Sequence, residues 1–173
     1  MVRPICAWRA AAVGLVVASS VALSGCGFTP LYATPGMTSE LAGVQVEAPP
    51  HSRLGFLMKE RLNEQLARAE GSRPLYVLKY EIADKRYPRG VAVNNVASRY
   101  EIDLTTKYTL ADATTGKVVL TDTVLTQVGY DSSSPPYSGL AAEQDGEARV
   151  ADQAAIAIRL ALSRYFLAHR PGM

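Results

Sequence analysis

Four basic side chains that could bind phosphate groups fall within one short stretch of the sequence: Lys85, Arg86, Arg89 and Arg99. Tyr87 and Tyr100 stand among them, and Asp84 is the sole acidic residue between positions 84 and 99. A guanidinium presents a planar fork of N–H donors that fits phosphate oxygens, and apolar neighbours suit a ligand that also carries acyl chains. These residues are therefore candidate contacts for a phosphorylated amphiphile. The alternative is a solvated hairpin tip, whose charges keep a strand edge from aggregating.

Patterns typical of catalysis or of metal binding do not occur in the sequence. His51 and His169 are the only histidines, and neither has a metal-ligand or triad partner at a useful spacing. A glycine-rich phosphate loop and a nucleophile elbow are also missing. Glu143 and Asp145 are acidic, but carboxylates near the start of a helix usually complement its dipole. We therefore expect no enzymatic activity, no metal and no other cofactor.

Residues 1–25 have the three parts of a secretory signal peptide, which is removed from the mature protein. The start is basic, residues 10–22 form a short apolar run, and small residues lead up to Cys26. The run is shorter than the roughly 20 residues that span a bilayer, although a membrane anchor or a buried helix is the alternative. The motif Leu-Ser-Gly-Cys at its end resembles the lipobox of bacterial lipoproteins. That resemblance implies that Cys26 carries S-linked diacylglycerol and an N-linked acyl chain.

The residue after the lipobox and the cysteine count bear on the location of the protein. Residue 27 is Gly rather than the Asp that retains many lipoproteins of enteric bacteria in the inner membrane, so the resemblance implies the outer membrane. Cys6 lies in the segment that is removed, and Cys26 would be lipidated, so we expect no disulfide. Several acyl chains on one residue would make the attachment permanent.

The charge balance argues against a nucleic-acid partner. The whole chain has 18 Lys and Arg residues against 16 Asp and Glu residues. Removal of the signal peptide takes away Arg3 and Arg9 and no acidic residue, so the mature chain is close to neutral. Any binding of an anion must come from a local cluster.

Hydrophobic periodicity predicts the elements of the mature chain. They are a strand over 41–48, a helix over 52–69, strands over 75–82, 99–110 and 117–130, and a helix over 140–168. Ser52 is expected to cap the first helix and Gly71 to end it. Residues 26–40, rich in Gly, Pro, Thr and Ser, are interpreted as the lipidated N-terminus and a tether, followed by one domain over 41–173. Gly146 is expected to loosen the first turns of the last helix.

These elements predict an α+β fold, a two-layer sandwich with the order β-α-β-β-β-α. Residues 99–110 alternate between apolar and polar side chains, as in a sheet that is covered on one face. Both helices need an apolar surface, so we expect them on that one face of a mixed four-stranded sheet. The first two strands should be parallel because a helix joins them, and the last three should form an antiparallel meander.

Several segments of the mature chain carry a further resemblance. Cys26-Gly-Phe-Thr-Pro-Leu-Tyr32 follows the signal peptide, and Ala97-Ser-Arg-Tyr100 opens the strand that ends at Tyr108-Thr-Leu-Ala-Asp112. Thr115-Gly-Lys-Val118 follows the turn, and Ala142-Glu-Gln-Asp-Gly-Glu-Ala-Arg149 leads into a helix that ends near Arg164-Tyr-Phe166. In this order the segments resemble the LPS-assembly lipoprotein family LptE, of the type found in alphaproteobacteria.

The resemblance implies a partner and a role. The lipoprotein would form a heterodimer with the outer-membrane β-barrel LptD, sit inside the barrel as a plug, help to assemble it and assist the insertion of lipopolysaccharide into the outer leaflet. The family can also bind lipopolysaccharide, so the four basic residues are candidates for contacts with lipid A or core phosphates. The competing interpretations are another periplasm-facing lipoprotein, accessory to a phospholipid transporter or a cell-wall synthase, and a lipoprotein hydrolase.

Overall fold

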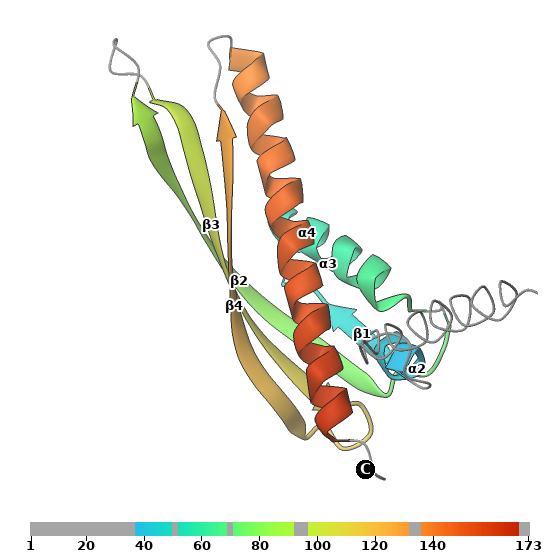
Figure 1. The fold of residues 1–173 in the computed structure, drawn as a ribbon. Helices are drawn as coiled ribbons and strands as arrows, with labels where there is room; N and C mark the ends of the chain where they lie inside the picture. The colour runs from blue at the N-terminus through green and yellow to red at the C-terminus, as the bar shows by residue number, and fades with distance from the viewer. Residues whose placement is uncertain (1–36, 50–51, 69–70, 92–96, 132–135, 170–173) are drawn as a thin grey trace, which may run out of the picture. The chain divides into compact units, whose positions relative to one another are not determined.

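The computed structural model describes residues 37–49, 52–68, 71–91, 97–131 and 136–169, all of which belong to one compact unit, Pro35–Met173. The elements in chain order are α2 (Met37–Ala42), β1 (Val44–Glu47), α3 (Arg53–Leu66), β2 (Tyr76–Val91), β3 (Ala97–Asp112), β4 (Val118–Asp131) and α4 (Pro136–Ala168) (Figure 1). The expected signal peptide, Cys26 and His51 lie outside the described residues.

The four strands form one mixed sheet in the order β1-β2-β3-β4. Strand β1 runs parallel to β2, whereas β2, β3 and β4 are antiparallel to their neighbours. Gly116 supplies the positive φ of 70° that the turn between β3 and β4 needs, and the carboxylate of Asp112 accepts a 2.7 Å hydrogen bond from the amide of Thr115. The predicted α+β class and mixed sheet are confirmed, and among the described residues the structure adds a helix that was not predicted, α2.

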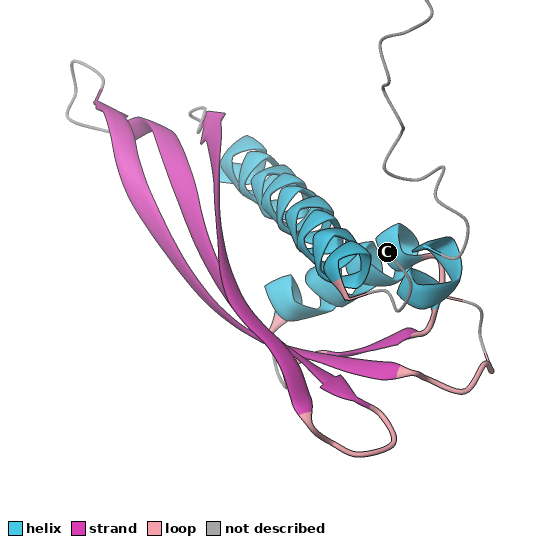
Figure 2. Ribbon diagram, turned by 60° about the horizontal axis from the view of Figure 1, so that its bottom comes forward, coloured by secondary structure: helices cyan, strands magenta, loops and turns pink. Residues whose placement is uncertain are grey.

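Helices α3 and α4 pack against each other and against the same face of the sheet, as Figure 2 shows. The inward side chains of the strands and the facing side chains of the helices form the core. Its fully buried members include Leu78, Ile102, Leu104, Tyr108, Leu110, Met58, Leu62, Val150, Ala154, Ile158 and Leu162. The hydroxyl of Tyr80 donates a 2.7 Å hydrogen bond to the carbonyl of Gly55, which ties β2 to the first turn of α3. Ser52 caps that turn as predicted, accepting a 3.1 Å hydrogen bond from the amide of Gly55.

Gly146 differs from the prediction in both its position and its role. Helix α4 begins at Pro136 and not near residue 140, so Gly146 lies well inside it. A Cβ atom at Gly146 would come 3.2 Å from Cδ1 of Ile102 and 3.2 Å from Cδ1 of Tyr130. The glycine therefore brings the helix close to the sheet and does not loosen its start.

The boundaries of the first elements also differ from the prediction. Strand β1 starts at Val44, because Leu41 is buried as part of helix α2, which occupies the end of the segment interpreted as a tether. Helix α3 ends at Leu66, where Ala67 adopts a left-handed conformation with a φ of 51°. Gly71 therefore does not terminate this helix.

Strands β2 and β3 are longer than predicted, and this changes the setting of the basic residues. Strand β2 continues past Ile82 to Val91, and β3 begins at Ala97. Lys85, Arg86 and Arg89 were expected between the predicted strands, but all three lie in β2, where Lys85 is opposite Asp103 of β3 in the strand register. Polar side chains occupy both faces in this region, so the alternation that marks a half-buried strand is lost.

Candidate functional site

The strand alternation divides the four candidate residues between two faces of the sheet. Arg86 lies on the face that carries the helices, where it reaches α4. Lys85 has the opposite orientation because neighbouring residues of a strand point to opposite faces. Arg89 and Arg99 pair with Glu101 and Asp131 on the outer face. The single cluster that the sequence suggested is thus one inward arginine and three outward cations.

Arg86 is the centre of an ion-pair network that joins a strand to two helices. Its guanidinium donates hydrogen bonds of 2.6 Å to Asp84 and to Glu147. Its Nε forms an ion pair with Glu143, with 2.9 Å between the charged atoms. The other oxygen of Glu147 pairs with Arg53 at the start of α3. Burial lowers the pKa of Arg86 and the three carboxylates raise it, with a raised pKa as the result. With three carboxylates around it, Arg86 holds α4 to the sheet.

Arg89 lies at an irregularity of β2 near the tip of the hairpin. The register between β2 and β3 shifts between Pro88 and Gly90, which suits a proline because it has no N–H for the ladder. The Nε of Arg89 donates to Glu101 at 3.1 Å, and its guanidinium carbon lies 5.6 Å from the centre of the Tyr87 ring. Half of the Arg89 side chain remains exposed.

Arg99 and Lys85 complete the outward set. The Nε of Arg99 donates to Asp131 at 2.9 Å, and this hydrogen bond and the positive charge hold the pKa of Asp131 below its ordinary value. Both side chains are mostly exposed, at 63% and 72%, so water competes with the pair and it is weak. Lys85 makes no ion pair within the described part of the chain. A phosphate group could therefore replace the carboxylate of Asp131 or bind Lys85 at little cost.

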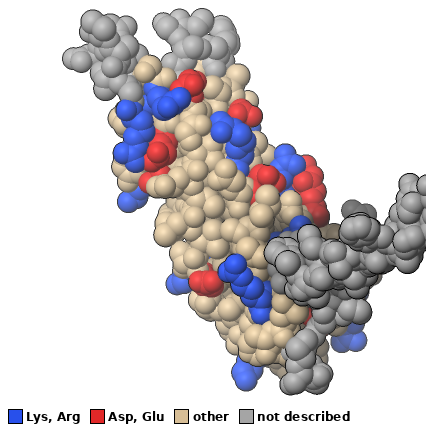
Figure 3. All heavy atoms as spheres, viewed as in Figure 1, with Lys and Arg blue, Asp and Glu red and all other residues tan. Residues whose placement is uncertain are grey.

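Charges of both signs alternate over this end of the molecule. Figure 3 shows Lys and Arg side chains interleaved with Asp and Glu side chains beside the start of α4 and the tip of the β2–β3 hairpin. The face in that view carries no broad patch of one sign. Binding of an anion at this end would depend on individual residues and not on a large positive surface.

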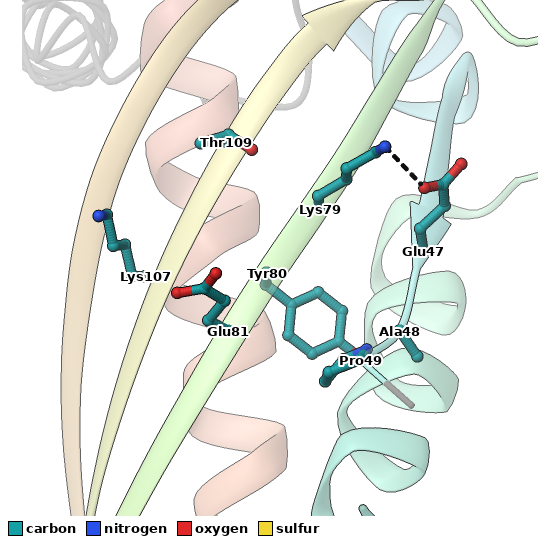
Figure 4. Close-up of a pocket in the computed structure, with 8 residues that line it drawn as sticks. All are labelled: Glu47, Ala48, Pro49, Lys79, Tyr80, Glu81, Lys107 and Thr109. Atoms are coloured by element: carbon teal, nitrogen blue, oxygen red, sulfur yellow. Dashed lines mark ion pairs between the residues drawn. The ribbon is translucent and has the colours of Figure 1, made fainter. Parts of the chain in front are cut away.

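A hollow of about 410 Å³ opens on the outer face at the end of β1. Figure 4 shows Lys79 pointing toward Glu47, with 3.3 Å between the charged atoms, while Lys107 and Glu81 line the other side. Two cations and two carboxylates balance each other, so the hollow favours neither an anion nor a cation.

The fold accounts for the remaining described residues that could act in catalysis or in metal binding. His169 stacks on Tyr165 with 4.2 Å between ring centres, and its Nδ1 lies 2.8 Å from the carbonyl of Tyr165. Within the described ranges, His, Cys, Asp and Glu side chains form no group of three that could hold a metal ion. None of the described helices combines the length and the apolar character needed to cross a membrane.

Comparison with known proteins shows the family. A family model described as "LptE: Lipopolysaccharide-assembly" matches residues 41–162. The chain belongs to the LptE family. A crystal structure of a candidate lipoprotein from Caulobacter crescentus CB15 is 35% identical, with a TM-score of 0.69, and the match covers 79% of this chain and 99% of that one. Among curated proteins, none matches this chain.

A second solved structure extends the likeness in fold. The minor lipoprotein from Acinetobacter baumannii is 17% identical, with a TM-score of 0.53, and the match covers 70% of this chain and 90% of that chain. At this identity the likeness concerns the fold alone. Membership in the LptE family makes the chain a membrane-associated periplasmic lipoprotein of lipopolysaccharide assembly, and not an enzyme.

Sequence reasoning missed the acidic partners of Arg86. Glu143 was interpreted only as a complement to the dipole of α4, and Glu147 was not singled out. Their spacing of four residues puts both carboxylates on one face of the helix, and that was the available signal. It could not show that this face would meet Arg86 of β2.

Proposed function

We propose that this member of the LptE family is anchored through Cys26 to the periplasmic side of the outer membrane and plugs an LptD-like β-barrel. In this position it would help the barrel to assemble and assist the insertion of lipopolysaccharide into the outer leaflet. The proposal treats residues 1–25 as a removed signal peptide and the segment from Cys26 to the domain as the lipid-bearing tether.

The uncovered face of the sheet is the observation that carries the plug proposal. In the described part of the chain no helix covers this face, and its central strand presents Glu101, Asp103, Thr105 and Lys107. These side chains suit a polar environment, and the lumen of a transmembrane barrel is polar. An uncovered polar face on a small, rigid sandwich therefore matches the wall of such a lumen.

The length of the hairpin supports an orientation along the membrane normal. Strand β1 pairs with the first residues of β2, so the end of the domain near the tether is also the start of the hairpin. Strands β2 and β3 have 16 residues each, about 50 Å at about 3.3 Å per residue. The hydrocarbon core of a bilayer is about 30 Å thick. A domain held on the periplasmic side could thus present Arg89 and Arg99 at the level of the outer leaflet.

The contacts with lipopolysaccharide phosphates are assigned within this proposal to the outward cations Lys85, Arg89 and Arg99. Their partners are single carboxylates on an exposed face or, for Lys85, no ion pair within the described residues. Arg86 was a candidate too, but three carboxylates engage its guanidinium and two of them belong to α4. We assign Arg86 the role of positioning α4 against the hairpin.

The plug proposal is tested by isolating the tagged, mature lipoprotein from solubilised outer membranes and identifying by mass spectrometry what accompanies it. We expect a large β-barrel protein in a ratio close to one to one. Recovery with a phospholipid transporter or a cell-wall synthase, or recovery of the lipoprotein alone, would overturn the plug assignment. The matched control is the same purification with an unrelated tagged lipoprotein of the same membrane.

A further inference from the structure

A second hollow, distinct from the charge-balanced one, lies between α3 and the free edge of β1. Its volume is about 350 Å³. The lining residues are Gln45, Val46, Lys59, Asn63, Arg68 and Gly71. Of the described residues that line the space, two are cations, two carry amide groups and none is a carboxylate.

The two cations keep donors available for a ligand. Lys59 is half-buried and makes no ion pair within the described residues. Arg68 uses one of its N–H groups in a 3.1 Å hydrogen bond to the carbonyl of Ser72, which fixes the guanidinium and leaves its other donors. Across the fold, Arg86, Arg89, Arg99 and Lys79 are all paired with carboxylates. Within the described residues, by contrast, this hollow brings together two cations that make no ion pair.

Anion binding is the chemistry that this arrangement fits. Lysine supplies a compact charge with three donors and arginine supplies a planar fork, and both recognise phosphate oxygens. The amide groups of Asn63 and Gln45 can donate to the same anion. Of the two acidic residues of α3, Glu64 is engaged by Arg61 on the exposed surface of the helix, and Glu60 is not among the residues that line the hollow.

We propose that this hollow binds the phosphate group of an anionic lipid headgroup at the periplasmic membrane surface. The proposal rests on the lipid-anchored location proposed above. Cys26 and Met37 are 11 positions apart, so the tether spans at most about 40 Å. Gln45 follows α2 at the start of β1, so the tether allows the hollow to reach the membrane to which Cys26 would be attached. Contact of the headgroup with Lys59 and Arg68 orients the tethered end of the domain on the bilayer.

The test uses the mature chain with Cys26→Ser, since a lipid anchor would mask a weaker contact. Its binding to phosphatidylcholine vesicles is measured by co-sedimentation with and without phosphatidylglycerol. We expect binding that requires phosphatidylglycerol, weakens with salt and falls roughly 25-fold in Lys59→Gln/Arg68→Gln, because each of the two cations near an anionic surface contributes about fivefold. The control Lys117→Gln/Arg164→Gln removes one lysine and one arginine near the same end and should retain binding.

A titration with inorganic phosphate distinguishes a lipid headgroup from a soluble anion as the ligand of the hollow. Amide NMR shifts of Asn63 and Gly71 during a phosphate titration should be present in the parent chain and lost in the double variant. Loss of both the shifts and the vesicle binding supports the proposal. Loss of the shifts alone overturns the headgroup as the source and leaves a site for a soluble anion. Unchanged responses in the double variant overturn the site, whereas the barrel pull-down reports on the plug proposal independently.

Discussion

Gly146 of α4 lies directly against Ile102 of β3, so that a Cβ atom at position 146 would come 3.2 Å from the Cδ1 of that isoleucine. Ile102 is fully buried, and Tyr130, the other close neighbour, stacks on Tyr100 with 5.6 Å between ring centres. Both side chains are buried. The close packing of α4 on the sheet therefore requires a glycine at position 146.

Replacing Gly146 with a large side chain should destabilise the fold strongly. We expect Gly146→Leu to lower the free energy of unfolding by about 2–3 kcal/mol, because overpacking forces shifts in the neighbouring side chains. The control Ala141→Leu places the same side chain at an exposed position of the same helix and should change stability by less than about 0.5 kcal/mol. Urea denaturation followed by circular dichroism gives both values. Equal effects of the two substitutions would contradict the close contact.

The Arg86 network should contribute measurable stability through Glu147. Glu147 is only 13% exposed and its carboxylate serves both Arg86 and Arg53. Glu147→Gln should lower the free energy of unfolding by about 1–2 kcal/mol, because it leaves two guanidinium groups without their shared anion. Asp145→Asn, which weakens an exposed pair with Arg149, should cost less than about 0.5 kcal/mol. Urea midpoints that do not separate the two variants would show that the network adds nothing.

Ala67 offers a stabilising substitution at the end of α3. Its φ of 51° and ψ of 40° are left-handed values that cost an L-residue about 1 kcal/mol. Ala67→Gly should therefore raise the free energy of unfolding by about 0.5–1 kcal/mol, after the greater freedom of glycine in the unfolded chain is counted. Ala141→Gly, at an exposed helical position with ordinary geometry, should have the opposite sign. A destabilised Ala67→Gly in urea denaturation would refute the left-handed cap.

Most of the sheet could be predicted because burial on one face leaves a regular alternation in the sequence. Residues 99–110 alternate in this way, and Ile102 and Leu104 are fully buried as that pattern requires. The parallel pairing of β1 with β2 follows from the helix that joins them. The outer half of β2 could not be predicted, because Lys85, Tyr87 and their neighbours are exposed on both faces. A strand without a buried face has no hydrophobic period to detect.

The site was less predictable because its contacts join distant parts of the chain. Arg86 and Glu147 are separated by 61 positions, and nothing in the local spacing of either residue indicates the other. The division of the four cations between two faces follows from alternation once β2 is known to include them. The error in the predicted extent of one strand thus became an error in the expected cluster.

The stability of the fold at high pH should report on buried Tyr108. Burial, together with the nearby carboxylate of Asp122, raises the pKa of Tyr108 to about 12 from an ordinary value of 10.0. The folded state therefore favours the neutral phenol, so the stabilisation is complete below pH 10 and is lost as the pH rises toward 12. The expected slope is up to about 1.4 kcal/mol per pH unit. In urea melts across this range, Tyr108→Phe should show a smaller dependence of stability on pH. Part of the dependence should remain in this variant, because burial also raises the pKa of Tyr80.

The role of the outward cations can be distinguished from that of Arg86 by measuring both the affinity for lipopolysaccharide and the stability of the variants. We expect the combined substitution Lys85→Gln, Arg89→Gln and Arg99→Gln to weaken binding of purified lipopolysaccharide at least about tenfold, because charge-assisted hydrogen bonds to phosphate are lost, and to leave the urea midpoint nearly unchanged. Arg86→Gln should instead lower the urea midpoint, because Glu143 and Glu147 would lose their shared cation. The matched control removes one lysine and two arginines from the other end of the domain: Lys117→Gln, Arg73→Gln and Arg164→Gln. An equal loss of affinity in the control and in the test variant would show that the effect comes from net charge alone. The assignment of Lys85, Arg89 and Arg99 as phosphate contacts would then be wrong.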